Sequence, residues 1–373
     1  MKRFTAVIAG SALTAFAALS MAGPAQAVNE TTTMDVKMPS TGGTLYKEAP
    51  RAVNWSVASK VNVLPGDATI LPMKNANLTM PTELSFNPDP DMPVCPDDQI
   101  GEVAVSFDVP EALSRCGDSL IGNGLAEFAL AQQTSLARDG VMLVFNGGMV
   151  KGLPRLKIYA YSYDTGVGLY TETLLQKNGD LFFPISQLTA DSSVTSLNLA
   201  IPGVEEQLFV ASKDITVSLP PGLTSDYAQA TCKNNSWDWS GDFLFGQRDT
   251  LGEPTSPTTS SSNTGVTDCV GAAGKGKFGG VKVNGPNKVK KGKKGTFKVK
   301  VKNNGTATIK GSKVKASGKG ASGKGSAGTL KPGQTKTVKV KVKFKKEGKV
   351  KTTFHTTGKG VSAKNGKITV KVK

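Results

Sequence analysis

The sequence is nearly devoid of histidine: His355 is the only one among its 373 residues. Ser-His-Asp and Cys-His hydrolysis and histidine-rich zinc catalysis all need that side chain beside the reacting group. Because residues 28–274 contain none, these mechanisms are excluded from that part of the chain. His355 lies in Val350–Thr356, where strand alternation directs it outward, so we interpret it as a surface residue.

Long hydrophobic runs are also missing beyond the first 27 residues. No later stretch reaches the roughly 18 consecutive apolar residues of a spanning helix, so no membrane span is predicted. Residues 1–27 are typical of a secretory signal peptide, with Lys2 and Arg3, an apolar stretch and the small-x-small end Ala25-Gln26-Ala27. The alternative is an N-terminal membrane anchor. We expect a secreted protein, extracellular or loosely associated with a cell wall.

Cysteine is scarce, with four residues at Cys95, Cys116, Cys232 and Cys269. An even count in an exported chain favours disulfides, and three pairings are open. The spacings match no C-x-x-C pattern and His355 is distant, so neither a metal nor another cofactor is expected.

Arginine is absent and acid almost absent from residues 275–373, which contain 30 lysines and one acid, Glu347. Their formal charge is 30 − 1 = +29 with His355 neutral. Residues 28–274 contain 14 basic and 28 acidic side chains, or −14. Opposite charges on two halves indicate two folding units with different surfaces.

Short apolar runs broken by Gly, Pro, Asn and Asp predict antiparallel β-structure in residues 28–269. The predicted strands are Lys60–Leu64, Val103–Val109, Val141–Asn146, Leu156–Tyr161, Leu181–Ile185 and Lys213–Leu219. Gly124–Leu136 fits a short amphipathic helix or a strand, and we interpret it as a strand.

Two segments have the composition of connections. Thr255–Thr264 resembles a flexible linker, but Cys232 and Cys269 flank it, so we interpret it as a loop within the first unit. Residues 270–280 are dense in glycine and contain the change of charge, so we predict the hinge there. The predicted organisation is a signal peptide (1–27), an acidic β-rich domain (28–269), a hinge (270–280) and a lysine-rich domain (281–373).

Lysine alternates with apolar residues in the last domain. In Phe297–Lys302 and Thr337–Lys345 the apolar residues share one face and the lysines the other. Ile368, Val370 and Val372 repeat the pattern. Turn signals between such runs predict about seven strands of an immunoglobulin-like sandwich.

This domain resembles the CARDB-type immunoglobulin-like modules of bacterial surface and secreted proteins. The matching residues are Val289–Gly295, Phe297–Gly305 and Gly328–Phe344. The resemblance implies a spacer or an adhesive appendage and specifies no ligand.

The first domain resembles uncharacterised secreted proteins of soil actinobacteria. The residues that carry the resemblance include Cys95-Pro96, Cys116–Gly124, Leu143–Gly147 and Gly152–Pro154. The resemblance brings no known activity. Together with proximity along the chain, it favours the local pairs Cys95–Cys116 and Cys232–Cys269. The fold class expected is all-β, a disulfide-containing sandwich followed by an immunoglobulin-like sandwich.

The lysine face has two interpretations. Dense lysine rows attract polyanions in a salt-sensitive way, whereas edge lysines can also serve only to keep strands soluble. Stacking aromatics are nearly absent, so no specific nucleic acid is expected. The predicted polyanion contacts are Lys298, Lys300, Lys302, Lys339, Lys341, Lys343 and Lys345.

Candidate sites in the first domain are less defined. Asn235–Phe245 places Trp237 and Trp239 on one strand face, as a sugar-stacking pair or as core beside a disulfide. An acidic loop at Asp89–Glu102 is a weak candidate for Ca²⁺ and is interpreted as solvated. Paired carboxylates can support glycoside hydrolysis, but no spacing selects two. The candidates are Glu102, Glu111, Asp118, Glu127, Glu172, Glu205 and Glu206.

The function predicted is that of a non-enzymatic cell-envelope or extracellular protein. Its basic domain would contact anionic surface polymers and present the acidic domain outward. The alternative is a secreted carbohydrate-active enzyme, or a carbohydrate-binding protein, with an immunoglobulin-like accessory module.

Overall fold

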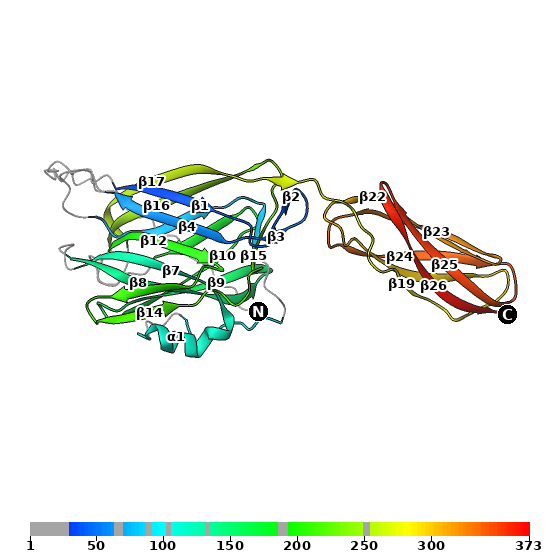
Figure 1. The fold of residues 1–373 in the computed structure, drawn as a ribbon, viewed down its shortest axis with the longest axis horizontal. Helices are drawn as coiled ribbons and strands as arrows, with labels where there is room; N and C mark the ends of the chain where they lie inside the picture. Colours follow the sequence, from blue (N-terminus) through cyan, green and yellow to red (C-terminus); the bar gives the residue numbers. More distant parts are fainter. Residues whose placement is uncertain are drawn as a thin grey trace, which may run out of the picture.

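The structure is a computed structural model that describes residues 30–62, 70–86, 91–101, 106–130, 135–185, 193–248 and 254–373. The chain is all-β, as predicted, and forms two bodies that lie end to end (Figure 1). The predicted signal peptide, residues 1–27, lies outside the described residues. Among the residues described, no helix has the length and apolar character needed to cross a membrane.

The first body, residues 30–272, is built on two antiparallel sheets. The seven-stranded sheet has the order β1 (Thr31–Lys37), β4 (Trp55–Asn62), β12 (Ser193–Ile201), β7 (Leu120–Leu130), β8 (Ser135–Val150), β9 (Leu153–Ser162), β10 (Val167–Leu174). The four-stranded sheet has the order β11 (Asp180–Pro184), β5 (Met73–Thr79), β16 (Ser236–Arg248), β17 (Pro254–Asp268). A hydrophobic core that includes Trp55, Val144 and Phe243 lies between them.

Smaller elements cover the outer side of the seven-stranded sheet at β8 and β9. They are the helix α1 (Val109–Cys116), the short 3₁₀ turn Gly117–Ser119 and the hairpin β13 (Glu206–Val210) and β14 (Ile215–Leu219). A second core that includes Val141, Phe145 and Tyr159 fills this layer. The run Val141–Asn146 is therefore buried on both faces, and this explains why it is apolar without alternation.

Short pairings complete this body. The strands β3 (Arg51–Ala52), β15 (Ala228–Ala230) and β6 (Leu84–Phe86) form one small sheet. The parallel pair β2 (Leu45–Tyr46) and β18 (Gly271–Ala272) forms another, at the exit of the chain.

Both disulfides join the cysteines nearest each other in the chain, as predicted. Cys95–Cys116 attaches the loop before α1 to the end of that helix, and Cys232–Cys269 attaches the end of β17 to the loop before β16. The described part of the chain contains no free cysteine.

Two secondary-structure predictions are wrong. Val109, predicted to end a strand, begins α1, because Asp108 accepts a hydrogen bond from the Glu111 backbone N–H and Pro110 occupies the first turn. Thr255–Thr264, predicted as a loop, belongs to β17, which pairs with β16 along most of its length. Residues 63–64 and 103–105 of the predicted strands lie outside the described residues.

Hydroxyl groups explain why a segment rich in serine and threonine forms β17. Its alternate side chains bind β1: Ser261 Oγ accepts from the Thr32 backbone N–H at 2.9 Å, and Thr267 donates to the Val36 carbonyl. Thr259 donates to the carboxylate of Glu30 in the same way. These contacts hold the four-stranded sheet against the edge of the seven-stranded sheet.

The second body, the tail (residues 275–373), is an immunoglobulin-like sandwich with its own core. Its strand order is β19 (Lys282–Asn284), β21 (Lys294–Lys302), β24 (Thr335–Phe344), β23 (Ala321–Leu330), β22 (Ile309–Gly318), β25 (Gly348–Gly358), β26 (Val361–Val372), β20 (Lys288–Val289). It has eight strands where about seven were predicted, and the predicted alternation holds. In β21 every second residue is buried and every lysine is exposed.

Hydrogen bonds hold the predicted hinge along much of its length. On the body side, Lys47 N–H donates to the Ala272 carbonyl at 3.2 Å. On the tail side, Gly279 N–H donates to the Lys302 carbonyl at 2.8 Å, and Phe278 is buried in the tail core. The carboxylate of Glu48 accepts from Thr308 N–H at 2.7 Å, and this bond directly connects the two bodies.

Neighbouring residues of β25 provide a test of the alternation in the tail. Phe354 is fully buried against Phe297, with ring centroids 5.4 Å apart, whereas His355 is half-buried and hydrogen-bonded to Ser317. Phe354→Ala should lower the free energy of unfolding by about 3–5 kcal/mol, because it leaves a cavity. His355→Ala should change it by no more than about 1 kcal/mol. Urea unfolding measures both, and similar losses would contradict the assigned faces.

Candidate functional site

The lysines of the tail form rows across its strands. The register of β21 and β24 places Lys298 directly opposite Lys339, and Lys294 opposite Lys343. Side chains opposite each other in an antiparallel pair have Cβ atoms about 4.5–5.5 Å apart, and like charges there repel. The structure therefore brings most of the predicted polyanion-contact lysines together on adjacent strands.

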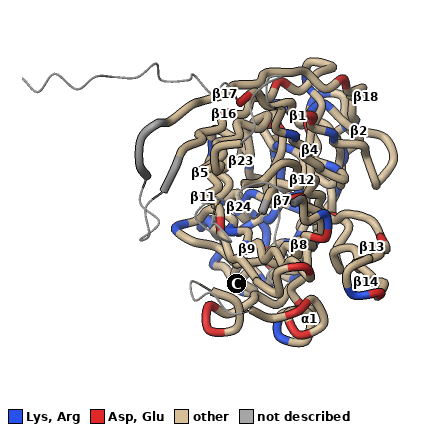
Figure 2. The backbone as a smooth tube through the Cα atoms, turned by 90° about the vertical axis from the view of Figure 1, so that its left-hand side faces the viewer, with Lys and Arg blue, Asp and Glu red and all other residues tan. Residues whose placement is uncertain are grey.

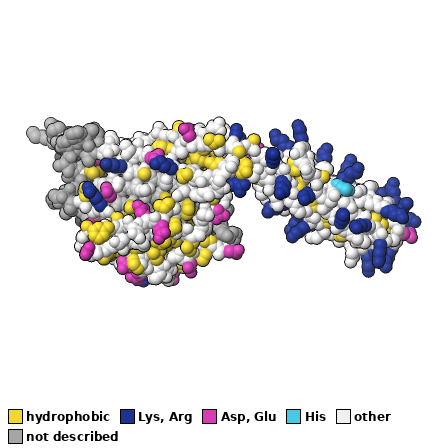
Figure 3. Space-filling model, in the orientation of Figure 1, with side chains coloured by type: hydrophobic (Ala, Val, Ile, Leu, Met, Phe, Trp, Pro, Cys, Tyr) yellow, Lys and Arg dark blue, Asp and Glu magenta, His cyan; other side chains and the backbone are white. Residues whose placement is uncertain are grey.

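This positive charge is almost unneutralised. In residues 275–373, all of which the structure describes, the only ion pair joins Lys291 to Glu347 at 3.2 Å. Figure 3 shows lysine side chains over the whole visible surface of the tail, while acidic side chains are scattered over the body. The repulsion among the lysines is a cost to folding.

A hollow of about 900 Å³ lies among some of these lysines, over β22 and β23. Lys315 and Lys324 are cross-strand partners that lie side by side in its lining, and Lys313 also lines it. Gly323 and Gly325 also line it, but through their backbone, because a Cβ at either position would point to the core valines of β24 and away from the lysines. Sequence reasoning missed these three lysines, although Lys313-Val314-Lys315 shows the same alternation as β21.

The tryptophans of β16 are placed differently from a stacking pair. Trp237 is 2% exposed, lies in the core and donates from Nε1 to the Thr231 carbonyl at 2.8 Å. Trp239 is half-buried over Gly265 and donates to Thr267 Oγ1 at 3.0 Å. Trp237 does border an open hollow of about 660 Å³, but its ring is not accessible as a platform. The sugar-stacking interpretation of Trp237 is therefore wrong, and its packing interpretation holds.

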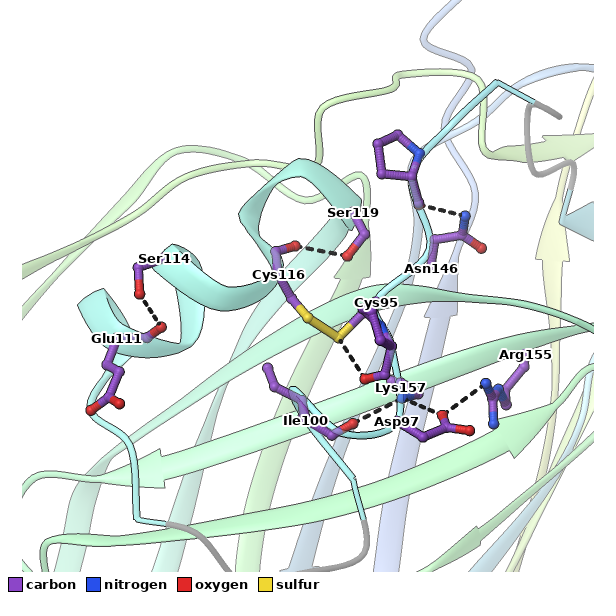
Figure 4. The surroundings of a disulfide bond; sticks show 12 residues. Cys95, Asp97, Ile100, Glu111, Ser114, Cys116, Ser119, Asn146, Arg155 and Lys157 are labelled. Carbon is purple, nitrogen blue, oxygen red and sulfur yellow. Dashed lines mark hydrogen bonds and ion pairs between the residues drawn. A yellow bond between two sulfur atoms is a disulfide. The ribbon is translucent and has the colours of Figure 1, made fainter.

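Three charged residues beside the first disulfide, Asp97, Arg155 and Lys157, form a cluster that we call the clamp. Lys157 has no exposed side-chain surface, and its ammonium donates to Asp97 Oδ1 at 2.6 Å and to the Ile100 carbonyl at 2.8 Å (Figure 4). Arg155 pairs with the same Asp97 oxygen at 3.0 Å. The hydrogen bond from Lys157 is the main cause that holds the pKa of Asp97 below its usual range. The clamp fixes the acidic loop to β9.

The clamp does not have the properties of an acid–base pair. Arg155 also pairs with Glu172 at 3.4 Å, so it lies between two carboxylates. A glycosidase acid needs a raised pKa, and that of Asp97 is lowered. Glu111 and Glu127 pair with other arginines, on α1 and between β7 and β8. Asp89 and Glu102 lie outside the described residues, and no group of metal-binding side chains occurs in the described part of the chain.

Comparison with known proteins identifies the tail only. Residues 281–361 match the family model of the CARDB domain, as the sequence resemblance predicted. No curated protein matches the chain, so the resemblance of the body stays a prediction.

Solved structures give weak likenesses. A transglutaminase of red sea bream aligns at 9% identity over 91% of this chain and 31% of its own, with a TM-score of 0.23. Trypsin-activated α2-macroglobulin of Escherichia coli aligns at 10% identity over 92% of this chain and 18% of its own, with a TM-score of 0.21. The chain thus spans less than a third of either structure, and at these scores neither likeness bears on function.

The clamp predicts a pH-dependent loss of stability. A carboxyl group with a lowered folded pKa stabilises the fold above its unfolded pKa of about 3.9, and this contribution is lost as the pH falls through the folded pKa. Asp97→Asn should lower the free energy of unfolding by about 1 kcal/mol at pH 7. Lys157 stays buried without its counter-charge, but the Asp97 side chain is 70% exposed, so solvent screens the pairing. The difference from the unsubstituted protein should shrink below pH 4.

Asp98→Asn is the matched control, because its side chain is exposed in the same loop. Unfolding in urea at pH 7 and pH 3 measures both variants. Equal stability of the two variants at pH 7 would contradict the clamp.

Repulsion between lysines on adjacent strands predicts that reversing the charge of one of them makes the tail more stable. Lys339→Glu places a carboxylate opposite Lys298 and should raise the free energy of unfolding by about 0.5–1 kcal/mol at low salt. The gain should shrink in 0.5 M NaCl, because salt screens exposed charges. Thermal unfolding at both salt concentrations measures it, and a loss of stability at low salt would show that the rows do not repel.

Proposed function

We propose that the protein is a secreted, non-enzymatic component of a cell envelope or its surroundings. The tail contacts anionic surface polymers through its lysine rows, and the first body is presented outward. The observation that supports this most is the set of directly opposed, unneutralised lysines on β21 and β24. A surface evolved only for solubility has no need for lysines of adjacent strands to face each other.

Export is supported by two disulfides and by the signal-peptide pattern of residues 1–27. The association is electrostatic, because the tail offers charge without stacking aromatics. Such binding weakens steeply with salt.

Sedimentation of the full-length protein with purified bacterial cell walls rich in anionic polymers tests the proposal. Binding should be strong at 20 mM NaCl and nearly absent at 500 mM NaCl. No binding at low salt, or binding unaffected by salt, would refute it.

Two variants of equal charge test whether the hollow over β22 and β23 is the main contact. Lys315→Gln with Lys324→Gln removes the cross-strand pair, and Lys364→Gln with Lys367→Gln removes two exposed lysines of β26. The first variant should reduce the slope of log affinity against log salt by about 1.5, and the second by less. Equal reductions would mean that the tail responds to total charge, with no preferred contact.

A further inference from the structure

The outward face of the four-stranded sheet carries an ordered set of polar side chains. Strands β5, β11, β16 and β17 lie along one side of the body in Figure 2. Their inward residues, such as Leu78, Leu181 and Phe243, are buried in the core. Alternation then requires that the residues between them face away from the core.

The register aligns these outward residues into rows. One row runs Asp180, Thr79, Ser240, Thr264 across the four strands. The next row runs Phe182, Asn77, Asp242, Ser262. Neighbours within a row are about 5 Å apart, and successive rows are about 7 Å apart. The rows thus present hydroxyl, amide and carboxylate groups at regular spacing on a broad surface.

Hydrogen bonds within the rows fix the two carboxylates. Thr79 donates to Asp180 Oδ1 at 2.8 Å, and Ser262 donates to Asp242 Oδ1 at 2.6 Å. Asn178 donates to the second oxygen of Asp180 at 2.6 Å. These contacts hold the acceptors in place before any ligand arrives, and this reduces the entropy lost on binding.

One aromatic ring lies among these polar groups. Phe182 is 52% exposed, while its neighbour Phe183 is 7% exposed and points into the core. The cross-strand partner of Phe182 is Asn77, and Asp242 follows in the same row. A ring beside fixed acceptors and amide donors matches a sugar ring, which has an apolar face and a rim of hydroxyl groups.

The charge of the two rows limits the class of ligand that this face can bind. The two rows contain two carboxylates and neither lysine nor arginine, so they repel an anionic polymer and suit an uncharged one that donates hydroxyl protons. The tail, in contrast, is rich in lysine and attracts anionic polymers. We propose that this face binds an uncharged glycan, with Phe182 stacking on a sugar ring and Asn77 and Asp242 hydrogen-bonding its hydroxyl groups. The proposal goes beyond the polyanion contact of the tail and does not depend on it.

Depletion of the full-length protein by insoluble cellulose, chitin and β-1,3-glucan tests this proposal. The experiment is run in 0.5 M NaCl, where contacts made by the tail are screened. The protein should bind at least one of the three, and Phe182→Ala should weaken that binding about tenfold. Asn77→Ala should also weaken it, by about fivefold.

Phe209→Ala is the matched control, because Phe209 is 60% exposed on the hairpin β13–β14, away from this sheet. It should leave binding unchanged, as should the double substitution of Lys315 and Lys324. Thermal unfolding confirms that Phe182→Ala keeps the fold, since its side chain lies outside the core. Binding to none of the three glycans, or equal losses for Phe182→Ala and Phe209→Ala, would overturn the proposal.

Loss of glycan binding leaves the salt-dependent wall binding of the tail intact, so failure of one proposal is distinguishable from failure of the other. Glycan binding that disappears in 0.5 M NaCl and depends on Lys315 and Lys324 would assign the contact to the tail and also overturn this proposal.

Discussion

The alternation of side chains in paired strands is the constraint on which both bodies depend. Each strand has a period of two residues, so the register of one pair decides which residues of the whole sheet enter the core. In β21 this buries Phe297, Val299 and Val301 and aligns the lysines outside. In β5 and β16 the same rule buries Leu78 and Phe243 and aligns asparagine, serine and aspartate outside. The candidate surfaces are therefore consequences of how the cores are built.

The structural features that could be predicted from the sequence are those whose cause lies within one short segment. The tail strands were predictable, because lysine and valine alternate within single runs such as Phe297–Lys302. The N-terminus of α1 was also within reach: Asp108, Pro110 and Glu111 form a helix-start signal that strand-like Val103–Val109 obscured. The disulfide pairs followed chain order.

The remaining features depend on residues far apart in the chain. The strand β17 exists because its hydroxyl groups reach β1, and Thr32 and Ser261 are separated by 229 positions. The polar rows need β5 to lie between β11 and β16, which no local pattern specifies. The packing of Trp237 also comes from distant strands that share its core, although its N–H partner, the Thr231 carbonyl, is only 6 positions away. Composition alone therefore described Thr255–Thr264 as a linker, and it left both a stacking and a core interpretation open for Trp237.

The junction between the two bodies determines how far apart the surface of the tail and the surface of the first body are held. The disulfide Cys232–Cys269, the β2–β18 pair and the Glu48–Thr308 hydrogen bond leave few residues free between the two cores. A short, hydrogen-bonded junction keeps the cationic rows of the tail away from the acidic body, as the end-to-end arrangement in Figure 1 shows. A long flexible linker would let the two charges collapse onto each other and occupy the lysines that a polymer must reach. The hydrogen bonds of residues 270–280 thus maintain the separation of charge that the proposed function requires.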